Sequence, residues 1–266
     1  MTGSNKRTDP IDTSVPHSAR IWNYWLGGKD NYPADRKAGD DYLREFPHME
    51  QLARAQRAFH GRAVRYLADE AGIRQFLDIG TGLPTLDNTH EVAQRVAPAA
   101  RIVYVDNDPL VLTHARALLT STPQGRTDYI DADVRDPDTI VEHAAQTLDF
   151  TRPAAVMLLG ILGHIPTNLQ ADRVVHRLTR RLAAGSYLVI CDGISTSAAR
   201  AAAQAGYNAT GATPYRLRMP EEIAAFFAGL EVLSPGLVAP NHWRPEHLEL
   251  MSTPAVEARA AVGRVR

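Results

Sequence analysis

FLDIGTGLP, at residues 76–84, joins a short apolar strand to a turn with two glycines, and the pattern of a helix follows soon after. In open α/β sheets, ligands bind beyond the carboxyl ends of the strands, at turns of this kind. Gly80 and Gly82 let the backbone pass close to a ligand where a side chain would clash. Two glycines alone fit a tight turn without a ligand equally well.

The turn departs from the dinucleotide-binding fingerprint, in which a third glycine follows the second by three positions. Thr85 stands at that position, and Pro84 before it removes a backbone N–H where a pyrophosphate would need donors. This pattern weighs against NAD or FAD and favours a ligand without a pyrophosphate. A nicotinamide-dependent oxidoreductase is therefore the weaker alternative.

Strand and helix patterns alternate after Gly72. The expected strands cover residues 76–79, 102–105, 129–130, 154–159 and 187–191, with candidate last strands at 231–233 and 260–265. The expected helices cover residues 49–71, 109–119, 137–148, 169–182, 196–205 and 220–227. Asp-Pro pairs at 108–109 and 136–137 supply an N-cap and a first-turn proline for two of them. This rhythm predicts an α/β fold, a doubly wound sheet with right-handed crossovers.

Carboxylates end the second and third expected strands. Asp106 follows the glycines at a position from which an acidic residue can accept both hydroxyls of a ribose. Asp108 is better explained as the cap before Pro109. Asn107 either borders an adenine or occupies the turn, and Asp133 either accepts from an adenine amino group or lies in a solvated loop.

Composition limits the class of protein. The chain has 266 residues and a formal net charge of −1, which gives no signal for nucleic-acid binding by charge alone. Cys191 is the single cysteine, which suits a reducing compartment and excludes an intrachain disulfide. The longest apolar run, residues 154–163, is about half of a membrane span, and the polar N-terminus lacks the apolar core of a signal peptide. We therefore expect a cytoplasmic protein without a membrane partner.

Several stretches carry a family resemblance. LDIGTG (77–82), YVDNDP (104–109) and DADVRDP (131–137) resemble the first three motifs of class I S-adenosylmethionine-dependent methyltransferases. More specifically, residues 18–36, 57–85 and 103–116 resemble an actinobacterial family of S-adenosylmethionine-dependent methyltransferases long catalogued as a domain of unknown function. The resemblance extends from about Val15 to the end of the chain.

The resemblance implies a Rossmann-like sheet of seven strands with the last antiparallel, formed by residues 73–266, and S-adenosylmethionine as cofactor. It implies cofactor contacts at Asp78, Gly80, Thr81, Gly82, Asp106, Asn107, Asp133, Val134, Leu159 and Gly160. The commoner methyltransferase turn has three alternating glycines, and Pro84 stands at the third position here. The methionine moiety is then held in a less conventional way.

The N-terminal residues 16–72 are expected to form a helical cap behind a mobile tail, residues 1–15. Aromatic side chains are concentrated at the start of the cap, which is unlike a solvated linker. As a lid, the segment would offer Arg20, Tyr24 or Lys29 to the cofactor carboxylate and Trp25 or Tyr32 to an acceptor. Trp22 would belong to the same lid. The alternative is a helical arm that only packs on the domain.

Three further residues are candidates for acceptor contacts. His164 follows the fourth expected strand and is either a base or a loop histidine bonded to the backbone. His242 and Trp243 lie in a late loop, where packing of the indole is an equally good explanation. The ten histidines show no HExxH or similar spacing, so we expect no metal.

The chemistry of methyl transfer needs little from the protein beyond orientation and exclusion of water, because the sulfonium is already activated. A general base is needed only for a nucleophile that is bound in its protonated form. An aromatic lid suits an enclosed pocket, so we expect a small-molecule acceptor. A sensor that binds the cofactor without turnover would carry the same motifs, and the sequence leaves the oligomeric state open.

Overall fold

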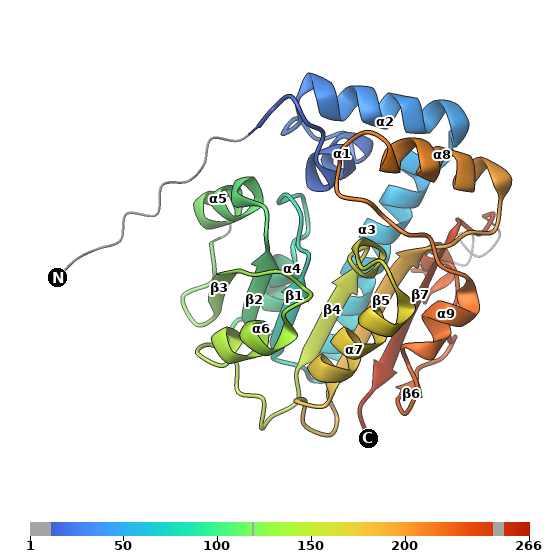
Figure 1. Ribbon diagram of the computed structural model, residues 1–266. Helices are drawn as coiled ribbons and strands as arrows, with labels where there is room; N and C mark the ends of the chain where they lie inside the picture. Colours follow the sequence, from blue (N-terminus) through green and yellow to red (C-terminus); the bar gives the residue numbers. More distant parts are fainter. Residues whose placement is uncertain (1–11, 119, 247–252) are drawn as a thin grey trace.

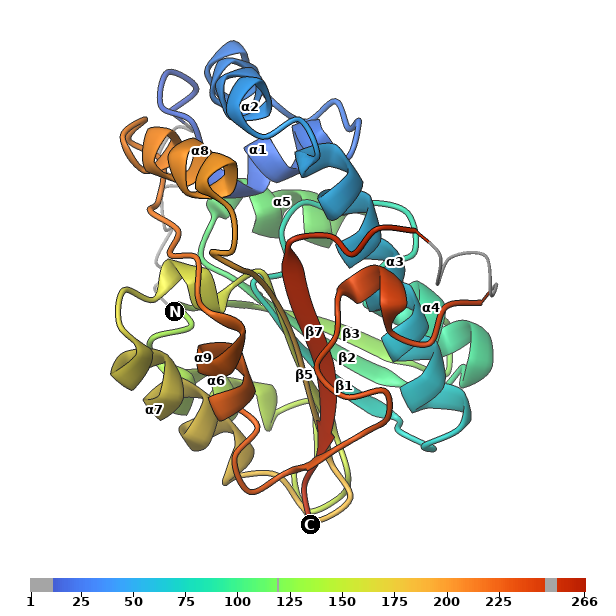
Figure 2. The ribbon, with the colours of Figure 1, turned by 90° about the vertical axis from the view of Figure 1, so that its right-hand side faces the viewer.

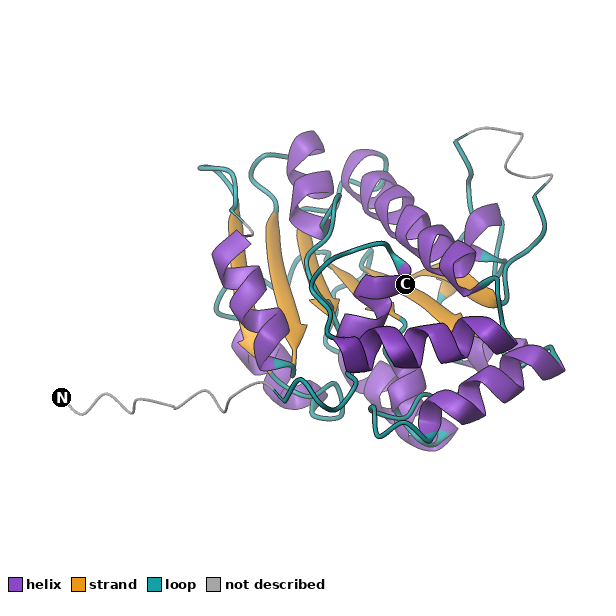
Figure 3. Ribbon diagram, turned by 90° about the horizontal axis from the view of Figure 1, so that it is seen from above, coloured by secondary structure: helices purple, strands orange, loops and turns teal. Residues whose placement is uncertain are grey.

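The computed structural model describes residues 12–118, 120–246 and 253–266, which form one sheet with helices on both sides (Figure 3). The strands are β1 (Gln75–Ile79), β2 (Arg101–Asp106), β3 (Arg126–Asp131), β4 (Ala155–Leu159), β5 (Tyr187–Gly193), β6 (Glu231–Val232) and β7 (Ala258–Arg264). The helices are α1 (Ser18–Trp25), α2 (Pro33–Glu45), α3 (Met49–Asp69), α4 (Thr89–Val96), α5 (Pro109–Leu118), α6 (Pro137–Ala144), α7 (Asn168–Thr179), α8 (Ala198–Asn208) and α9 (Pro220–Ala225). Short 3₁₀ turns cover Leu162–His164 and Pro240–His242.

The seven strands lie in the order β3-β2-β1-β4-β5-β7-β6. The first five are parallel, and β7 runs antiparallel between β5 and β6. The predicted doubly wound sheet with an antiparallel last strand is thereby confirmed. Because the chain order reverses between β1 and β4, the segments that follow these two strands lead to helices on opposite faces of the sheet, α4 and α7, and leave room for a ligand.

Alternate side chains along the strands face two separate hydrophobic cores. On β1, Phe76 belongs to the core shared with α3 and α4, whereas Leu77 belongs to the core shared with α6, α7 and α9. This alternation follows from the two-residue period of a strand. Figure 2 shows α3 and α4 on one side of the sheet and α6, α7 and α9 on the other.

Helices α1, α2 and α8 lie together beyond the carboxyl ends of the strands (Figure 1). Tyr42 of α2 packs edge-on against Trp25 of α1 and Tyr207 of α8, with ring centroids 5.1 and 6.4 Å away. Arg20 of α1 forms a buried ion pair with Asp35 of α2 at 3.0 Å. The first two helices are thus fixed to each other by charge and to α8 by aromatic packing.

The boundaries of most elements agree with the sequence patterns to within three residues. Helix α6 is an exception and ends at Ala144, because the amides of Thr147 and Leu148 both turn back to the Ala144 carbonyl at 3.0 and 2.8 Å. The predicted end of α5 at Leu119 lies outside the described residues, as do positions 1–11 of the predicted tail.

Candidate functional site

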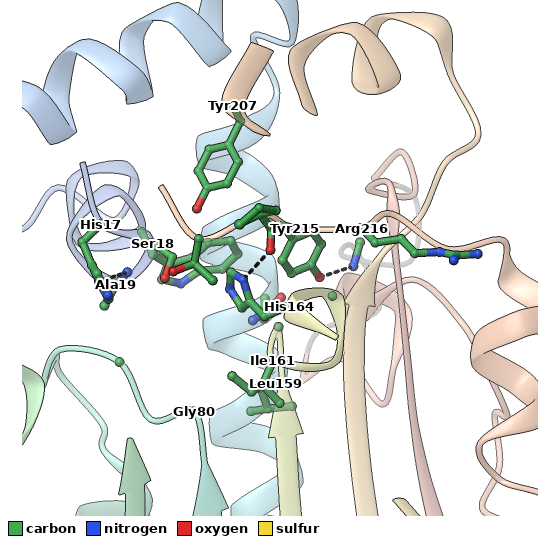
Figure 4. Close-up of a pocket in the computed structure, with 18 of the residues that line it drawn as sticks. His17, Ser18, Ala19, Gly80, Leu159, Ile161, His164, Tyr207, Tyr215 and Arg216 are labelled. Carbon is green, nitrogen blue, oxygen red and sulfur yellow. Dashed lines mark hydrogen bonds between the residues drawn. The ribbon is translucent and has the colours of Figure 1, made fainter. Parts of the chain in front are cut away.

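A cavity of about 810 Å³ opens at the carboxyl ends of β1, β2 and β4, beneath α1 and α8 and beside α3. Figure 4 shows Gly80 and Leu159 at its floor, the segment from His17 to Ala19 at one side, and Tyr207 directed into it from α8. All ten residues that the sequence assigns to the cofactor line this cavity: Asp78, Gly80, Thr81, Gly82, Asp106, Asn107, Asp133, Val134, Leu159 and Gly160. They meet because parallel strands bring their carboxyl ends to one edge of the sheet.

The turn after β1 depends on its glycines. Gly80 and Gly82 have φ angles of 73° and 67°, in the left-handed region that other residues rarely adopt. A Cβ at Gly80 would lie 2.6 Å from Cδ1 of Ile161, so the two strand ends approach each other closely there. The amide of Gly82 donates to Asp106 at 2.9 Å, which ties this turn to the end of β2.

Asp106 is held by backbone amides on both oxygens. Oδ2 accepts from Gly82, and Oδ1 accepts from Asp108 N–H at 3.0 Å. Burial raises the pKa of the Asp106 carboxyl, while these two hydrogen bonds oppose the shift. Asp108 caps α5 by accepting from Leu110 N–H at 2.8 Å, which confirms its predicted structural role.

A chain of polar contacts links α3 to the end of β1. The Thr89 hydroxyl donates to Asp78 Oδ2 at 2.5 Å, so the Nε2–H of His60 donates to the Thr89 oxygen at 2.7 Å. Burial lowers the pKa of His60 well below its usual value and keeps the ring neutral. Its Nδ1 is then a lone-pair acceptor without a partner among the described residues. Burial also raises the pKa of Asp78 to about 6.

The remaining cofactor candidates differ in their contacts. Asp133 accepts from the backbone N–H and Nε–H of Arg135 at 2.8 and 2.9 Å, and the Arg135 side chain lowers the pKa of the Asp133 carboxyl. Gly160 has a φ of 74°, and the Gln56 amide nitrogen lies 3.1 Å from where its Cβ would be. The end of β4 is thus covered by a polar side chain of α3.

The cavity continues over β4 and β5, where its walls are mainly aromatic. Trp22 and Trp25 of α1, Tyr42 of α2, Tyr207 of α8 and Tyr215 contribute to this half. His164 also lines it, and its Nδ1–H donates to the Pro214 carbonyl at 3.0 Å (Figure 4). After the contacts predicted from the sequence, we call this part, over β4 and β5, the acceptor half and the part over β1, β2 and β3 the cofactor half.

Four of the predicted lid residues lie outside the cavity. Arg20 is occupied by Asp35, and its guanidinium also lies 5.3 Å from the ring centroid of Tyr32. Tyr24 donates to Asp40 at 2.6 Å, and Lys29 lies in the exposed turn before α2. The assignment of Arg20 and Tyr24 to the cofactor carboxylate is therefore corrected, since Asp35 and Asp40 of α2 hold these two side chains. Lys29 does not line the cavity, and its assignment stays a prediction.

His242 and Trp243 also lie away from the cavity. The Nε2–H of His242 donates to the Thr253 carbonyl at 2.8 Å. Trp243 is fully buried against Phe59 and Tyr66 of α3, at centroid distances of 5.3 and 6.1 Å. Their proposed acceptor contacts are corrected in the same way, because this loop covers the side of α3 that faces away from the site.

Several lining residues were not predicted from sequence. They come from α3, from α8 and from the segment after it: Gln56, Arg57, His60, Arg200, Gln204, Tyr207 and Tyr215. Among them, Arg57 of α3 donates to the Leu86 carbonyl at 2.6 Å beside the β1 turn. No spacing signal connects residue 200 with residue 80, so only the packing of α8 on α2 could reveal the acceptor half.

The described residues offer neither a metal site nor a membrane span. No group of three or more His, Cys, Asp and Glu side chains in that part of the chain is arranged to hold a metal ion. No helix there is long and apolar enough to cross a membrane. Cys191 is buried, which raises the pKa of its thiol well above the usual value.

Comparisons with known proteins agree on the kind of protein to which this chain is similar. A family model described as S-adenosyl methyltransferase matches residues 4–266. A DUF574 family protein from Streptomyces avermitilis is 45% identical, with a TM-score of 0.92, over 97% of this chain and 100% of the other. A proposed methyltransferase from Thermobifida fusca is 42% identical, with a TM-score of 0.88, over 96% and 97% of the two chains. Comparison with curated proteins gives no match.

Proposed function

The chain belongs to the S-adenosyl methyltransferase family, and from this premise we propose that it transfers a methyl group from S-adenosylmethionine to a small molecule bound in the acceptor half of the cavity. The family assignment makes the chain a methyltransferase with S-adenosylmethionine as its methyl donor. Of the two enzyme classes considered from the sequence, the family assignment supports the methyltransferase and not the nicotinamide-dependent oxidoreductase. The identity of the acceptor is the part that we propose.

The residues of the cofactor half fit this donor. Each Asp106 oxygen accepts one backbone N–H and keeps a second lone pair for a ribose hydroxyl. Asp78 offers a carboxylate acceptor to an ammonium group, and the Thr89 hydroxyl between Asp78 and His60 fixes its position. The close approach of Gly80 to Ile161 leaves no room for side chains where the backbone passes the ligand. When bound, the donor supplies an activated methyl group, and these side chains bind and orient it.

The observation that carries the proposal is the continuity of one cavity. Asp106 and Tyr207 line the same space, and Leu159, Gly160 and Ile161 lie between them at the end of β4. A small molecule enclosed by α1 and α8 is therefore adjacent to the cofactor half. In-line transfer requires this adjacency together with the exclusion of water.

His164 is the residue that we propose as proton acceptor when the acceptor carries a hydroxyl or amine. Its Nδ1–H is committed to the Pro214 carbonyl. Burial lowers the pKa of the ring, which is therefore neutral at pH 7 and keeps a lone pair on Nε2. A neutral imidazole in a half-enclosed cavity is in the protonation state that a general base requires.

Titration calorimetry tests the cofactor half directly. We expect S-adenosylhomocysteine to bind the wild type, and Asp106→Asn to weaken binding by about tenfold or more, because hydrogen bonds to a charged group contribute roughly 1.5–3 kcal/mol. Asp131→Asn is the matched control, since Asp131 ends the neighbouring strand with an exposed side chain. Equal affinity of the wild type and Asp106→Asn would contradict the assignment.

Turnover tests the acceptor half. A cell extract is separated into small molecules, proteins and RNA, and each fraction is incubated with S-adenosylmethionine and the protein. We expect S-adenosylhomocysteine to form with the small-molecule fraction. Formation with the protein or RNA fraction alone would overturn the proposed class of acceptor.

A further inference from the structure

Arg200 lies in the first turn of α8 and lines the acceptor half of the cavity. Only 3% of the surface of Arg200 is exposed. The guanidinium passes over Gly193 at the end of β5, where a Cβ would lie 2.8 Å from Nη2. A side chain at position 193 would therefore displace the guanidinium, so the glycine provides the space that Arg200 occupies.

The charge of Arg200 has no anionic partner among the described residues. Its Nε has no hydrogen-bond partner there, and Nη1 lies 3.1 Å from the sulfur of Met49, a weak acceptor. The rings of Phe46 and Tyr42 lie 4.9 and 5.6 Å from the guanidinium carbon. These contacts offset part of the cost of burying the charge, but they satisfy few of the five donors of a guanidinium.

Two other buried arginines show how this protein satisfies such a group. Arg20 pairs with Asp35. Arg218 donates to the carbonyls of Leu162 and Ile165 at 2.7 and 2.9 Å and to Asn168 at 3.0 Å. Arg200 therefore stands apart from the buried arginines that have structural partners. A buried charge that lacks a partner and borders a cavity is suited to an anion that arrives with a ligand.

We propose that Arg200 binds a carboxylate of the acceptor and that the acceptor is an aromatic carboxylic acid. This inference rests on the proposed function, since it assumes that the acceptor occupies the half of the cavity over β4 and β5. The planar fork of arginine matches a carboxylate with two parallel hydrogen bonds. The aromatic walls formed by Trp25, Tyr207 and Tyr215 suit a flat, apolar body attached to that carboxylate.

The position of Arg200 also sets the length of such a molecule. Cys191 contacts Gln56, which covers Gly160 at the end of β4. Gly193, beneath the guanidinium, is two residues further along β5, or about 7 Å in an extended strand. An aromatic ring spans a distance of this order. The carboxylate would then lie at one end of the ring, with the atom that receives the methyl group at the other.

Calorimetry with 4-hydroxybenzoate and its neutral analogue 4-hydroxybenzamide tests the proposal on protein saturated with S-adenosylhomocysteine. We expect the acid to bind the wild type at least tenfold more tightly than the amide. In Arg200→Met this preference should disappear, and in Arg173→Met it should remain, because Arg173 is exposed on α7. The affinity for S-adenosylhomocysteine, measured first on each variant, reports separately on the proposed function.

The melting temperature of the ligand-free variants gives a second measurement that needs no acceptor. An arginine reserved for a ligand leaves its buried charge uncompensated in the free protein, so Arg200→Met should melt at or above the wild-type temperature. A clear fall would assign Arg200 to holding α8 on α2 and would overturn the proposal. The proposal would also be overturned if the acid does not bind the wild type, or if the acid and the amide bind it equally. An acid preference that survives in Arg200→Met, or a tenfold loss of S-adenosylhomocysteine affinity in that variant, would overturn it as well.

Discussion

Asp192 shows at the scale of one residue how the site uses buried charge. It is the penultimate residue of β5, with 1% of its surface exposed, and its Oδ1 accepts from the Tyr215 hydroxyl at 2.5 Å. Burial raises the pKa of the Asp192 carboxyl to about 6, although Tyr215 and Arg218 both oppose the shift. The carboxyl is therefore ionised near pH 7 at a cost to the folded state, in return for fixing Tyr215 at the wall of the cavity.

The pKa of Asp192 predicts a pH-dependent effect of Asp192→Asn. The folded carboxyl titrates near 6 and the ordinary value is 3.8, so between these values the folded protein holds a proton that the unfolded chain has released. Stability from this group is therefore lost as the pH rises through that window. Relative to the wild type, we expect Asp192→Asn to gain on the order of 1 kcal/mol of unfolding free energy between about pH 5 and pH 7.5, measured by urea denaturation.

Asp172→Asn is the control for this measurement, because Asp172 is exposed on α7. The difference between this variant and the wild type should stay constant over the same pH range. A pH-independent difference for Asp192→Asn would contradict the raised pKa. Asp192→Asn also loses the charge-assisted bond to Tyr215, which changes the unfolding free energy itself. The test is therefore how the difference in unfolding free energy between the variant and the wild type varies with pH.

At the scale of an element, helices α1 and α2 approach closely because one face of α2 carries a glycine. A Cβ at Gly39 would lie 2.7 Å from Cδ1 of Tyr24 and 3.2 Å from Nε1 of Trp25. The same Nε1–H donates to the Gly39 carbonyl at 3.3 Å. The small residue thus permits both the contact of the two helices and a hydrogen bond between them.

Two glycine substitutions separate this packing effect from helix propensity. Gly206 lies in α8 with nothing within 4 Å of its Cβ position, so Gly206→Ala should stabilise the protein by about 0.5–1 kcal/mol. Gly39→Ala gains the same propensity but forces overlap with Tyr24, which costs about 1–3 kcal/mol. We expect thermal unfolding to show a higher melting temperature for the first variant and a lower one for the second. A rise for both would show that α1 moves aside freely.

At the scale of the whole molecule, α3 connects the two parts of the structure. Met49 and Leu52 lie near the cap helices, and Val64 and Leu67 lie further along the same helix against the sheet. All four belong to one hydrophobic core that also contains Trp25. The division into a cap, residues 16–72, and a methyltransferase domain, residues 73–266, remains a prediction. Because the two parts share this core, we expect that neither unfolds without the other.

A single cooperative unfolding transition is the expected consequence of that core. Tryptophan fluorescence reports on Trp22 and Trp25 in the cap and on Trp243 behind α3, while circular dichroism at 222 nm reports on all helices. We expect both signals to give the same urea midpoint. Fluorescence that changes at lower urea than circular dichroism would show that the cap unfolds on its own.

The sequence by itself determined the sheet and which residues gather at the carboxyl ends of β1, β2 and β3. Hydrophobic runs and Asp-Pro caps mark the strands and helices locally, and parallel strands must bring their carboxyl ends to one edge. Asp78, Gly80 and Asp106 could therefore be grouped without coordinates, although they belong to different strands. The resemblance to methyltransferases then supplied the cofactor.

Only the tertiary structure decided the acceptor half. Its residues come from α1, α3, α8 and the segment around Tyr215. These elements are far apart in the sequence, and no local sequence pattern predicts which of them pack together. The same limit explains the misplaced candidates. Arg20 forms an ion pair with Asp35, and Trp243 packs against Phe59 of α3. A buried cation needs a polar partner and a buried indole needs a packing surface. Which residues supply them depends on how the whole chain folds.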